Sequence, residues 1–288
     1  MKAQLTHSER LARISSNIRR FGYLPRLERV DADAGAITVC GFGPSLADTW
    51  QDIRRDRPIM TTSGAHDFLI GKGIIPTYHA ECDPREYKTE FIRNSHPDVT
   101  YFINSQCHPS MFEALLPHRR VVMWHGLTDE GAENLVALID WLEPGAVLLN
   151  GGTNIGMRAL PLARHKGHTE FDMHGFDCCY RGTQQWAGEH LGQFHQMVRV
   201  EVEGKRFQTS DLMMVSTDDF FLRILPMMPN CRFRVHGDGL LDARLKVYNR
   251  DPELAMTPAW WKPVNFVVRK PDEVRMPQGY RFQFRMGA

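Results

Sequence analysis

Short apolar runs alternate with helical stretches along most of this 288-residue chain, and the alternation limits the folds open to it. Strands are expected at Ala36–Cys40, Pro58–Thr62, Thr77–Glu81, Val99–Asn104, Arg120–Trp124, Ala146–Asn150, Glu170–His174 and Arg232–His236. Helices are expected at Ser45–Arg55, Ala65–Gly71, Pro84–Asn94, Pro109–Leu115, Asp129–Leu142, Asn154–Lys166 and Thr217–Pro226. This order is typical of strands joined by crossover helices. The sequence therefore predicts an α/β fold of Rossmann-like type, with a mostly parallel sheet flanked by helices.

Two regions interrupt the alternation. Val198–Gln208 alternates apolar and polar residues around Glu-Gly, which predicts a small antiparallel β-hairpin insertion within residues 195–210. The segment 251–288 is rich in Pro, Trp, Phe and Arg, and we expect an irregular C-terminal tail that wraps the core or, alternatively, forms an acceptor-binding flap. A single domain is therefore expected over residues 1–250, beginning with a helical segment over 1–30.

Composition excludes several classes of protein. The formal net charge of +1 gives no global electrostatic footprint for nucleic acid or membrane. No apolar run approaches the roughly 20 residues of a membrane-spanning helix, and the polar start has no signal-peptide core. The six cysteines fit neither a paired zinc site nor a small disulfide scaffold. We expect a cytoplasmic protein with no membrane partner, and a homo-oligomer stays open.

The residues that follow the predicted strands are unusually small or polar. In open parallel sheets, ligands bind outside the carboxyl ends of the strands. Here those ends read Gly41-Phe42-Gly43, Ser63-Gly64, Cys82-Asp83, Asn104-Ser105, His125-Gly126, Asn150-Gly151-Gly152-Thr153-Asn154, His174-Gly175-Phe176-Asp177 and His236-Gly237-Asp238-Gly239. Eight such ends along one edge predict a built ligand site.

The first of these turns carries the sharpest signal, a strand that runs into Gly41-Phe42-Gly43-Pro44-Ser45-Leu46 and then a helix. Glycines allow close approach of the backbone, and a helix N-terminus offers free N–H groups to phosphate. The turn lacks the Lys of a Walker A motif and the full dinucleotide-binding fingerprint. It predicts a phosphate cradle, with a tight turn that binds nothing as the alternative.

A second turn, Asn150-Gly151-Gly152-Thr153, also precedes a helix, with Thr153 or Asn154 as a natural N-cap. This turn predicts a second contact to an anion or a sugar, with simple capping of the helix as the alternative. Asp83 follows a strand and precedes Pro84, so it fits a contact to ribose, a metal or an amino group, or else a turn.

Three histidines, His125, His174 and His236, end predicted strands and are candidate general bases, because histidine titrates near neutrality. Asp177 is placed to orient His174, and Asp238 to orient His236. Their spacing does not match a metal site, and none is predicted. For Thr217-Asp218-Asp219 we expect acids in the first turn of a helix rather than a metal motif.

Five motifs in order, Gly41-Phe-Gly-Pro-Ser-Leu46, Ser63-Gly-Ala65, Cys82-Asp-Pro84, Gly151-Gly-Thr153 and His174-Gly-Phe-Asp177, resemble those of the MptE-like superfamily. This superfamily includes archaeal 6-hydroxymethylpterin pyrophosphokinases and the motility accessory factors, which are taken to transfer nonulosonic acids to flagellin. The core layout is also similar to that of bacterial sialyltransferases that use a CMP-activated sugar. The resemblance covers Ala36–Asp177, about half of the chain.

The resemblance implies that Gly41, Gly43, Pro44 and Ser45 hold a nucleotide, with Ser63 and Gly64 near the nucleoside. Asp83 matches the acidic motif, and Gly151–Thr153 match the second glycine turn. The pyrophosphokinase branch carries Asp-x-Asp-Gly where this chain has Glu81-Cys-Asp-Pro84. This departure disfavours metal-dependent pyrophosphoryl transfer.

The leading prediction is a transferase that uses a nucleotide-activated donor, as a glycosyltransferase acting on an acceptor hydroxyl of a protein, glycan or modified nucleic acid. The predicted catalytic residues are His174, His236, His125 and Asp177. The predicted nucleotide contacts are Gly41, Phe42, Gly43, Pro44, Ser45, Ser63, Gly64, Asp83, Ser105, Asn150, Gly151, Gly152 and Thr153. One alternative is an ATP- and Mg²⁺-dependent pyrophosphokinase with Asp83 and Asp177 at the metal; another is a nucleotide-binding module without turnover.

Overall fold

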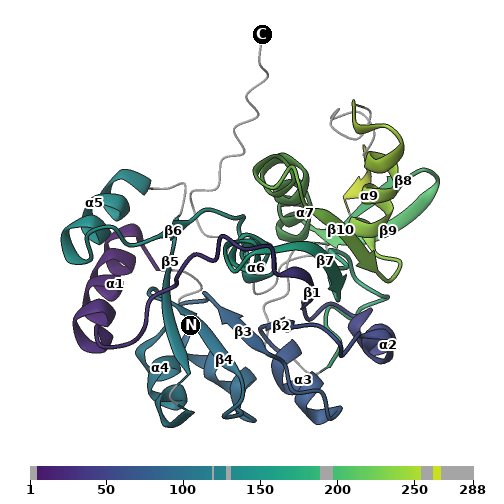
Figure 1. Cartoon of the computed structure of the whole chain (residues 1–288). Helices are drawn as coiled ribbons and strands as arrows, with labels where there is room; N and C mark the ends of the chain where they lie inside the picture. The colour runs from purple at the N-terminus through teal and green to yellow at the C-terminus, as the bar shows by residue number, and fades with distance from the viewer. Residues whose placement is uncertain (1–4, 119, 128–130, 189–196, 254–261, 267–288) are drawn as a thin grey trace.

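The computed structural model describes residues 5–118, 120–127, 131–188, 197–253 and 262–266. Its main sheet has eight parallel strands in the order β10-β7-β1-β2-β3-β4-β5-β6 (Figure 1). They are β1 (Gly35–Cys40), β2 (Ile59–Thr62), β3 (Tyr78–Glu81), β4 (Thr100–Asn104), β5 (Val121–Gly126), β6 (Leu148–Leu149), β7 (His168–His174) and β10 (Arg232–His236). The predicted α/β fold of Rossmann-like type is confirmed.

Helices lie on both faces of this sheet. They are α1 (His7–Phe21), α2 (Leu46–Thr49), α3 (Ala65–Gly71), α4 (Pro109–Leu115), α5 (Ala132–Leu142), α6 (Ile155–His165), α7 (Asp211–Asp219), α8 (Leu225–Met227) and α9 (Leu240–Arg250). Tighter 3₁₀ turns cover η1 (Trp50–Asp52), η2 (Glu86–Ile92) and η3 (Leu116–His118), and a π-helical turn, η4 (Phe220–Ile224), joins α7 to α8. Within the described ranges, no helix has both the length and the apolar character that a membrane crossing requires.

Three helix predictions are wrong in detail. The helix expected over Ser45–Arg55 stops at Thr49 and a short 3₁₀ turn, because Ile53 turns to an extended conformation and buries its side chain. The segment expected to be α-helical over Pro84–Asn94 forms 3₁₀ turns, which bring Lys88 and Phe91 to one inward face. The helix expected at Thr217 begins earlier, at Asp211, and α9 is an addition that the sequence pattern did not predict.

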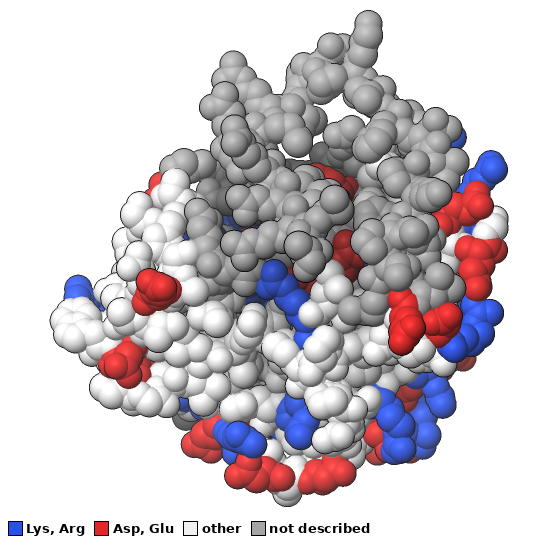
Figure 2. Space-filling view, turned by 90° about the horizontal axis from the view of Figure 1, so that it is seen from above, with Lys and Arg blue, Asp and Glu red and all other residues white. Residues whose placement is uncertain are grey.

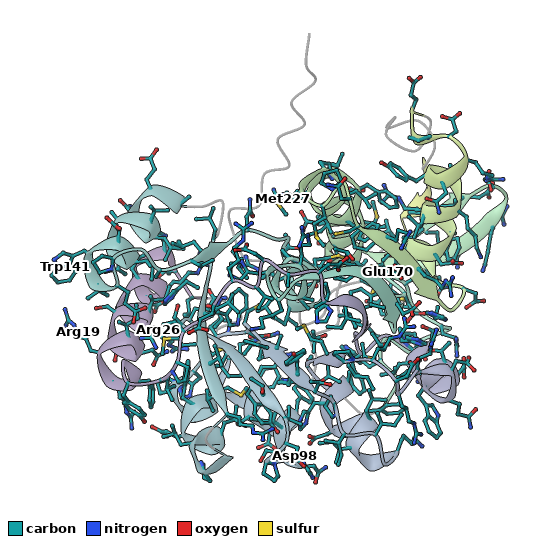
Figure 3. The ribbon with its side chains drawn as sticks, in the orientation of Figure 1. Arg19, Arg26, Asp98, Trp141, Glu170 and Met227 are labelled. Atoms are coloured by element: carbon teal, nitrogen blue, oxygen red, sulfur yellow. The ribbon has the colours of Figure 1, made fainter. Side chains whose placement is uncertain are left out.

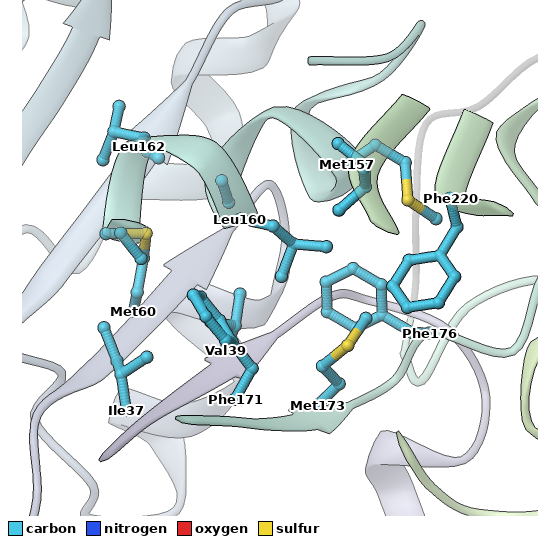
Figure 4. Close-up of a cluster of buried hydrophobic side chains, with 14 of the residues drawn as sticks. Ile37, Val39, Met60, Met157, Leu160, Leu162, Phe171, Met173, Phe176 and Phe220 are labelled. Carbon is cyan, nitrogen blue, oxygen red and sulfur yellow. The ribbon is translucent and has the colours of Figure 1, made fainter. Parts of the chain in front are cut away.

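Side chains of the main sheet alternate between two apolar cores. Ile37 and Val39 of β1 point toward α6, which crosses the central strands and contributes Leu160 and Leu162 (Figure 4). On the other face, β4 and β5 pack against α1, α4 and α5 in a second core. Because α6 runs from β6 back to β7, it spans the sheet and fixes β7 beside β1.

A second, antiparallel sheet contains β8 (Met197–Val202), β9 (Lys205–Ser210) and β11 (Lys262–Phe266), in the order β11-β8-β9. The predicted hairpin is present, and its turn residues Glu203 and Gly204 have φ of 48° and 80°, as a tight primed turn requires. The prediction of an irregular tail is wrong for Lys262–Phe266, which pairs with β8 because a hairpin edge offers unpaired backbone groups. The other predictions for the wrapping tail fall on residues 254–261 and 267–288, outside the described ranges.

Candidate functional site

All eight strand ends lie on one edge of the sheet, because every pair of neighbouring strands is parallel. Strands are spaced about 4.8 Å apart, so the ends of β7 and β5, five spacings apart, are separated by roughly 24 Å. Figure 3 shows Arg26, beside α1, and Glu170 of β7 on opposite sides of the sheet. His125 and His174 therefore lie on the same edge of the sheet but too far apart to act on the same reacting group.

The first glycine turn is closed by the residues that follow β7. The amide of Gly43 donates to the carbonyl of Gly175 at 2.9 Å. The amide and hydroxyl of Ser45 both donate to Oδ2 of Asp177, at 3.1 and 2.9 Å. Burial raises the pKa of Asp177, although the bonds from Ser45 act in the opposite direction. The predicted phosphate cradle thus holds an internal carboxylate on the Ser45 amide expected to face phosphate.

The second glycine turn shows the same arrangement. The amide of Thr153 donates to Oδ2 of Asp219 at 2.7 Å, and Asn154, not Thr153, caps α6 by accepting from the amide of Met157. Asp218 and Asp219 lie in the last turn of α7, so the expectation of first-turn acids is wrong. The helix instead begins at Asp211, and the side chain of Ser210 forms its N-cap.

Asp219→Ala is expected to lower the free energy of unfolding by about 1–3 kcal/mol, because the Thr153 amide would lose its hydrogen bond to this buried carboxylate. Urea denaturation measures the effect. Asp140→Ala, on the exposed side of α5, is the control and should change stability by less than about 0.5 kcal/mol. Equal effects of the two substitutions would show that Asp219 does not hold the turn.

His174 and His236 form a stacked pair at the ends of β7 and β10, with ring centroids 4.1 Å apart. Nδ1 of His174 is 3.1 Å from Oγ1 of Thr49, and Nε2 of His236 is 3.2 Å from Asp172. The prediction that Asp177 orients His174 and Asp238 orients His236 is therefore wrong. Burial, followed by the charge of His236, lowers the pKa of His174 to about 4. Such an imidazole is a weak base at neutral pH.

His125 is enclosed on both sides. Its Nδ1 lies 2.9 Å from Oγ of Ser105, and its Nε2 lies 2.7 Å from Oε2 of Glu143, which also pairs with Arg26. Burial alone would raise the pKa of Glu143, but the hydrogen bonds from His125 and Arg26 lower it to about 2. Ser105 and His125 thus join β4, β5 and the end of α5 in one buried polar contact.

A charged cluster lies where β2 and β3 end. Nζ of Lys88 donates to Oγ of Ser63 at 2.9 Å and lies 3.6 Å from Oδ2 of Asp83. Nε of Arg85 donates to both oxygens of Asp83, at 2.8 and 3.0 Å. Burial alone would raise the pKa of Asp83, but Arg85 and Lys88 together lower it. Ser63 has a φ of 49°, a strained value for a residue with a side chain.

The model of a family described as 6-hydroxymethylpterin diphosphokinase MptE-like matches residues 10–183. The chain belongs to the MptE-like family. Among solved structures it is similar to the "Structure of MAf glycosyltransferase from Magnetospirillum magneticum AMB-1", with a TM-score of 0.62 and 16% identity. The match covers 87% of this chain and 42% of that one, so the chain spans less than half of its length. A search of curated proteins gave no match.

The region matched to the MptE-like family runs from α1 through β7 and includes both glycine turns and the charged cluster, but not His236. Three buried polar residues in this region are not among the predicted catalytic residues or nucleotide contacts, although Asn104 belongs to one of the predicted polar strand ends: Glu81, Asn104 and Arg158. Glu81 ends β3, and its Oε1 accepts from the amides of Cys82 and Asp83. Its Oε2 is buried and forms no hydrogen bond with any residue that the structure describes. Burial raises the pKa of Glu81. The available signal was a glutamate at the end of a predicted strand.

The described residues contain no group of three His, Cys, Asp or Glu side chains arranged to hold a metal ion. Asp83 and Asp177, the two carboxylates assigned to Mg²⁺ under the pyrophosphokinase alternative, bind Arg85 and Ser45 instead. The strand ends are also separate, since β3 and β7 are three spacings apart, or roughly 14 Å. The two carboxylates are therefore not brought together.

Proposed function

We propose that this chain is a transferase that takes a group from a nucleotide-activated donor, with glycosyl transfer as the leading reaction. Membership of the MptE-like family and the fold shared with a Maf glycosyltransferase support this class. The main observation in favour of glycosyl transfer is the charged cluster, in which Asp83 pairs with Arg85 and Lys88. We also propose that it acts in the cytoplasm.

Lys88 supplies the chemistry that such a transfer needs. Only 5% of the residue is exposed, and its ammonium is fixed between Ser63 and Asp83 at the strand ends. A positive charge held in a site shielded from water stabilises the negative charge that develops on a departing phosphate. Ser63 and Gly64 lie beside it, and the ring of Phe42 packs against Gly64, so these three remain our proposed nucleotide contacts.

The same cluster favours glycosyl transfer over pyrophosphoryl transfer. Transfer from ATP ordinarily uses Mg²⁺ bound by free carboxylates. Both oxygens of Asp83 instead accept from the guanidinium of Arg85. For the proton of the acceptor hydroxyl we propose Glu81, because its raised pKa and unbonded Oε2 suit a general base better than the enclosed His125.

Lys88→Met is expected to reduce turnover of the donor by about 10²–10³-fold, the usual loss when one group that stabilises a developing anion is removed. A thermal-shift screen with CMP, CDP, UDP, GDP and ATP, with and without Mg²⁺, first identifies the donor nucleotide. Release of that nucleotide from its activated sugars then measures turnover. Lys72→Met, an exposed lysine after α3, is the control and should keep the wild-type rate.

The two reactions give opposite results in this screen. A glycosyltransferase of the proposed kind binds its nucleotide without Mg²⁺ and releases it only from an activated sugar. Binding of ATP that requires Mg²⁺, with AMP as the product, would establish the pyrophosphokinase instead. Wild-type turnover in the Lys88→Met variant would show that the charged cluster takes no part in the reaction.

A further inference from the structure

Arg158 on α6 is a buried cation that pairs with no carboxylate among the described residues. Arg244, which is also buried, pairs with Asp218, and the half-buried Arg26 and Arg57 pair with Glu143 and Asp172. Arg158 is 7% exposed, and its Nε donates to the carbonyl of Gly152 at 3.0 Å. Its Nη1 is buried and has no hydrogen-bond acceptor within the described part of the chain.

A second unpaired donor lies beside it. Asn104, the last residue of β4, accepts from the amide of Gln106 through Oδ1 at 3.0 Å. Its Nδ2 is buried, and none of the described residues provides an acceptor for it. Both nitrogens converge on Gly126. A Cβ built there would lie 2.8 Å from Nδ2 and closer than 3.0 Å to Nη1 of Arg158. The missing side chain of Gly126 is therefore what makes room for the two donors.

A buried guanidinium without an anionic partner is costly, and removing the partner of a buried ion pair typically destabilises a protein by several kcal/mol. Two N–H donors side by side match the paired oxygens of a carboxylate or phosphate. The position fits a ligand as well, because Asn104 and Gly126 end β4 and β5 at the edge where parallel sheets bind substrates. Both donors are therefore suited to bind an anion.

We propose that Arg158 and Asn104 form a subsite that binds the anionic oxygens of the activated donor. The inference rests on the proposed function, and it adds that the donor carries a carboxylate or phosphate group to this position. The chemistry shared by the two groups is a pair of anionic oxygens. The subsite is distinct from the charged cluster at Lys88, since α6 and the η2 segment cover different faces of the sheet.

Asn104→Asp gives the sharpest test. The substitution keeps the acceptor for Gln106 and replaces the unpaired Nδ2 with an oxygen beside Arg158. The variant should carry its own anion, so we expect a higher Tm for the ligand-free protein and at least a tenfold loss of affinity for anionic probes. Calorimetric titration with inorganic pyrophosphate tests phosphate, and titration with N-acetylneuraminate tests carboxylate. A lower Tm with unchanged affinity would overturn the subsite.

Arg158→Met separates ligand binding from a structural role. It keeps an apolar stem and removes the charge, so probe affinity should fall at least tenfold while the Tm stays level or rises. Arg164→Met, on the exposed side of the same helix, should change neither. A large drop in Tm together with wild-type affinity would make Arg158 structural.

The inference and the proposed function can fail separately. Loss of donor turnover in Lys88→Met, with full probe affinity in Arg158→Met, would overturn the subsite alone. Pyrophosphate or N-acetylneuraminate binding that depends on Arg158, in a protein that turns over no activated sugar, would support the subsite and overturn the glycosyltransferase. Failure of the wild-type protein to bind either probe would overturn the subsite.

Discussion

Gly43→Ala is expected to lower the free energy of unfolding by on the order of 3 kcal/mol, a large share of the stability of a typical domain. A Cβ at this position would lie 2.7 Å from the carbonyl oxygen of Gly175 and closer still to the carboxylate of Asp177. Neither can move away cheaply, because one is backbone and the other is held by Ser45. Urea denaturation monitored by circular dichroism measures the change.

Gly71→Ala is the matched control. This glycine ends α3, and a Cβ there would meet nothing within 4 Å. Alanine should therefore stabilise the protein by up to about 1 kcal/mol through helix propensity. A Gly43→Ala protein as stable as wild type would mean that the turn is open, and the phosphate cradle predicted from the sequence would then regain its support.

The second large effect is a dependence of stability on pH that originates in His174. Burial holds its folded-state pKa at about 4, below the value of 6.5 expected in the unfolded chain. The unfolded chain therefore binds the proton more readily, so stability falls as pH drops from 6.5 to 4. A shift of this size corresponds to about 3 kcal/mol. His174→Asn should remove that part of the slope, as seen in urea midpoints measured across this range.

Three neighbouring groups also affect the pKa of His174. His236 disfavours the proton on His174, whereas Asp172 and Thr49 favour it. Thr49→Val is the control, because burial is the main cause of the low pKa, so the slope should persist without the hydroxyl. Some slope will also remain from His79, whose pKa burial lowers as well. An identical slope in wild type and His174→Asn would exclude His174 as its source.

Local periodicity predicted the fold because a parallel α/β sheet repeats one short unit. All eight strands were found, and the small hairpin was recognised from alternation around Glu203 and Gly204. The strand ends also lie on one edge, as expected. These features depend on neighbours a few residues apart, which a sequence shows directly.

The contents of the site depend on contacts that the sequence does not show. Asp177 closes the first glycine turn only because β7 inserts beside β1, which brings residues 132 apart in sequence into hydrogen-bond distance. Successive residues of a strand also point to opposite faces of the sheet, so His125 and the next residue, Gly126, contact different groups. The sequence shows Arg158 only as one polar residue of an amphipathic helix. Its unpaired Nη1 is recognised only once α6 packs on the sheet and brings this atom beside Gly126.

The strand order has a consequence for how the chain folds. From β1 to β6, each strand lies beside the next one in the chain, so this half can assemble through contacts of short sequence separation. The other half cannot, because β7 must return across α6 to the far side of β1, and such closures are slow. The amide of Ser45 finds its acceptor only at that last step. Its protection from hydrogen exchange should therefore arise late in refolding and mark the moment at which the two halves become one sheet.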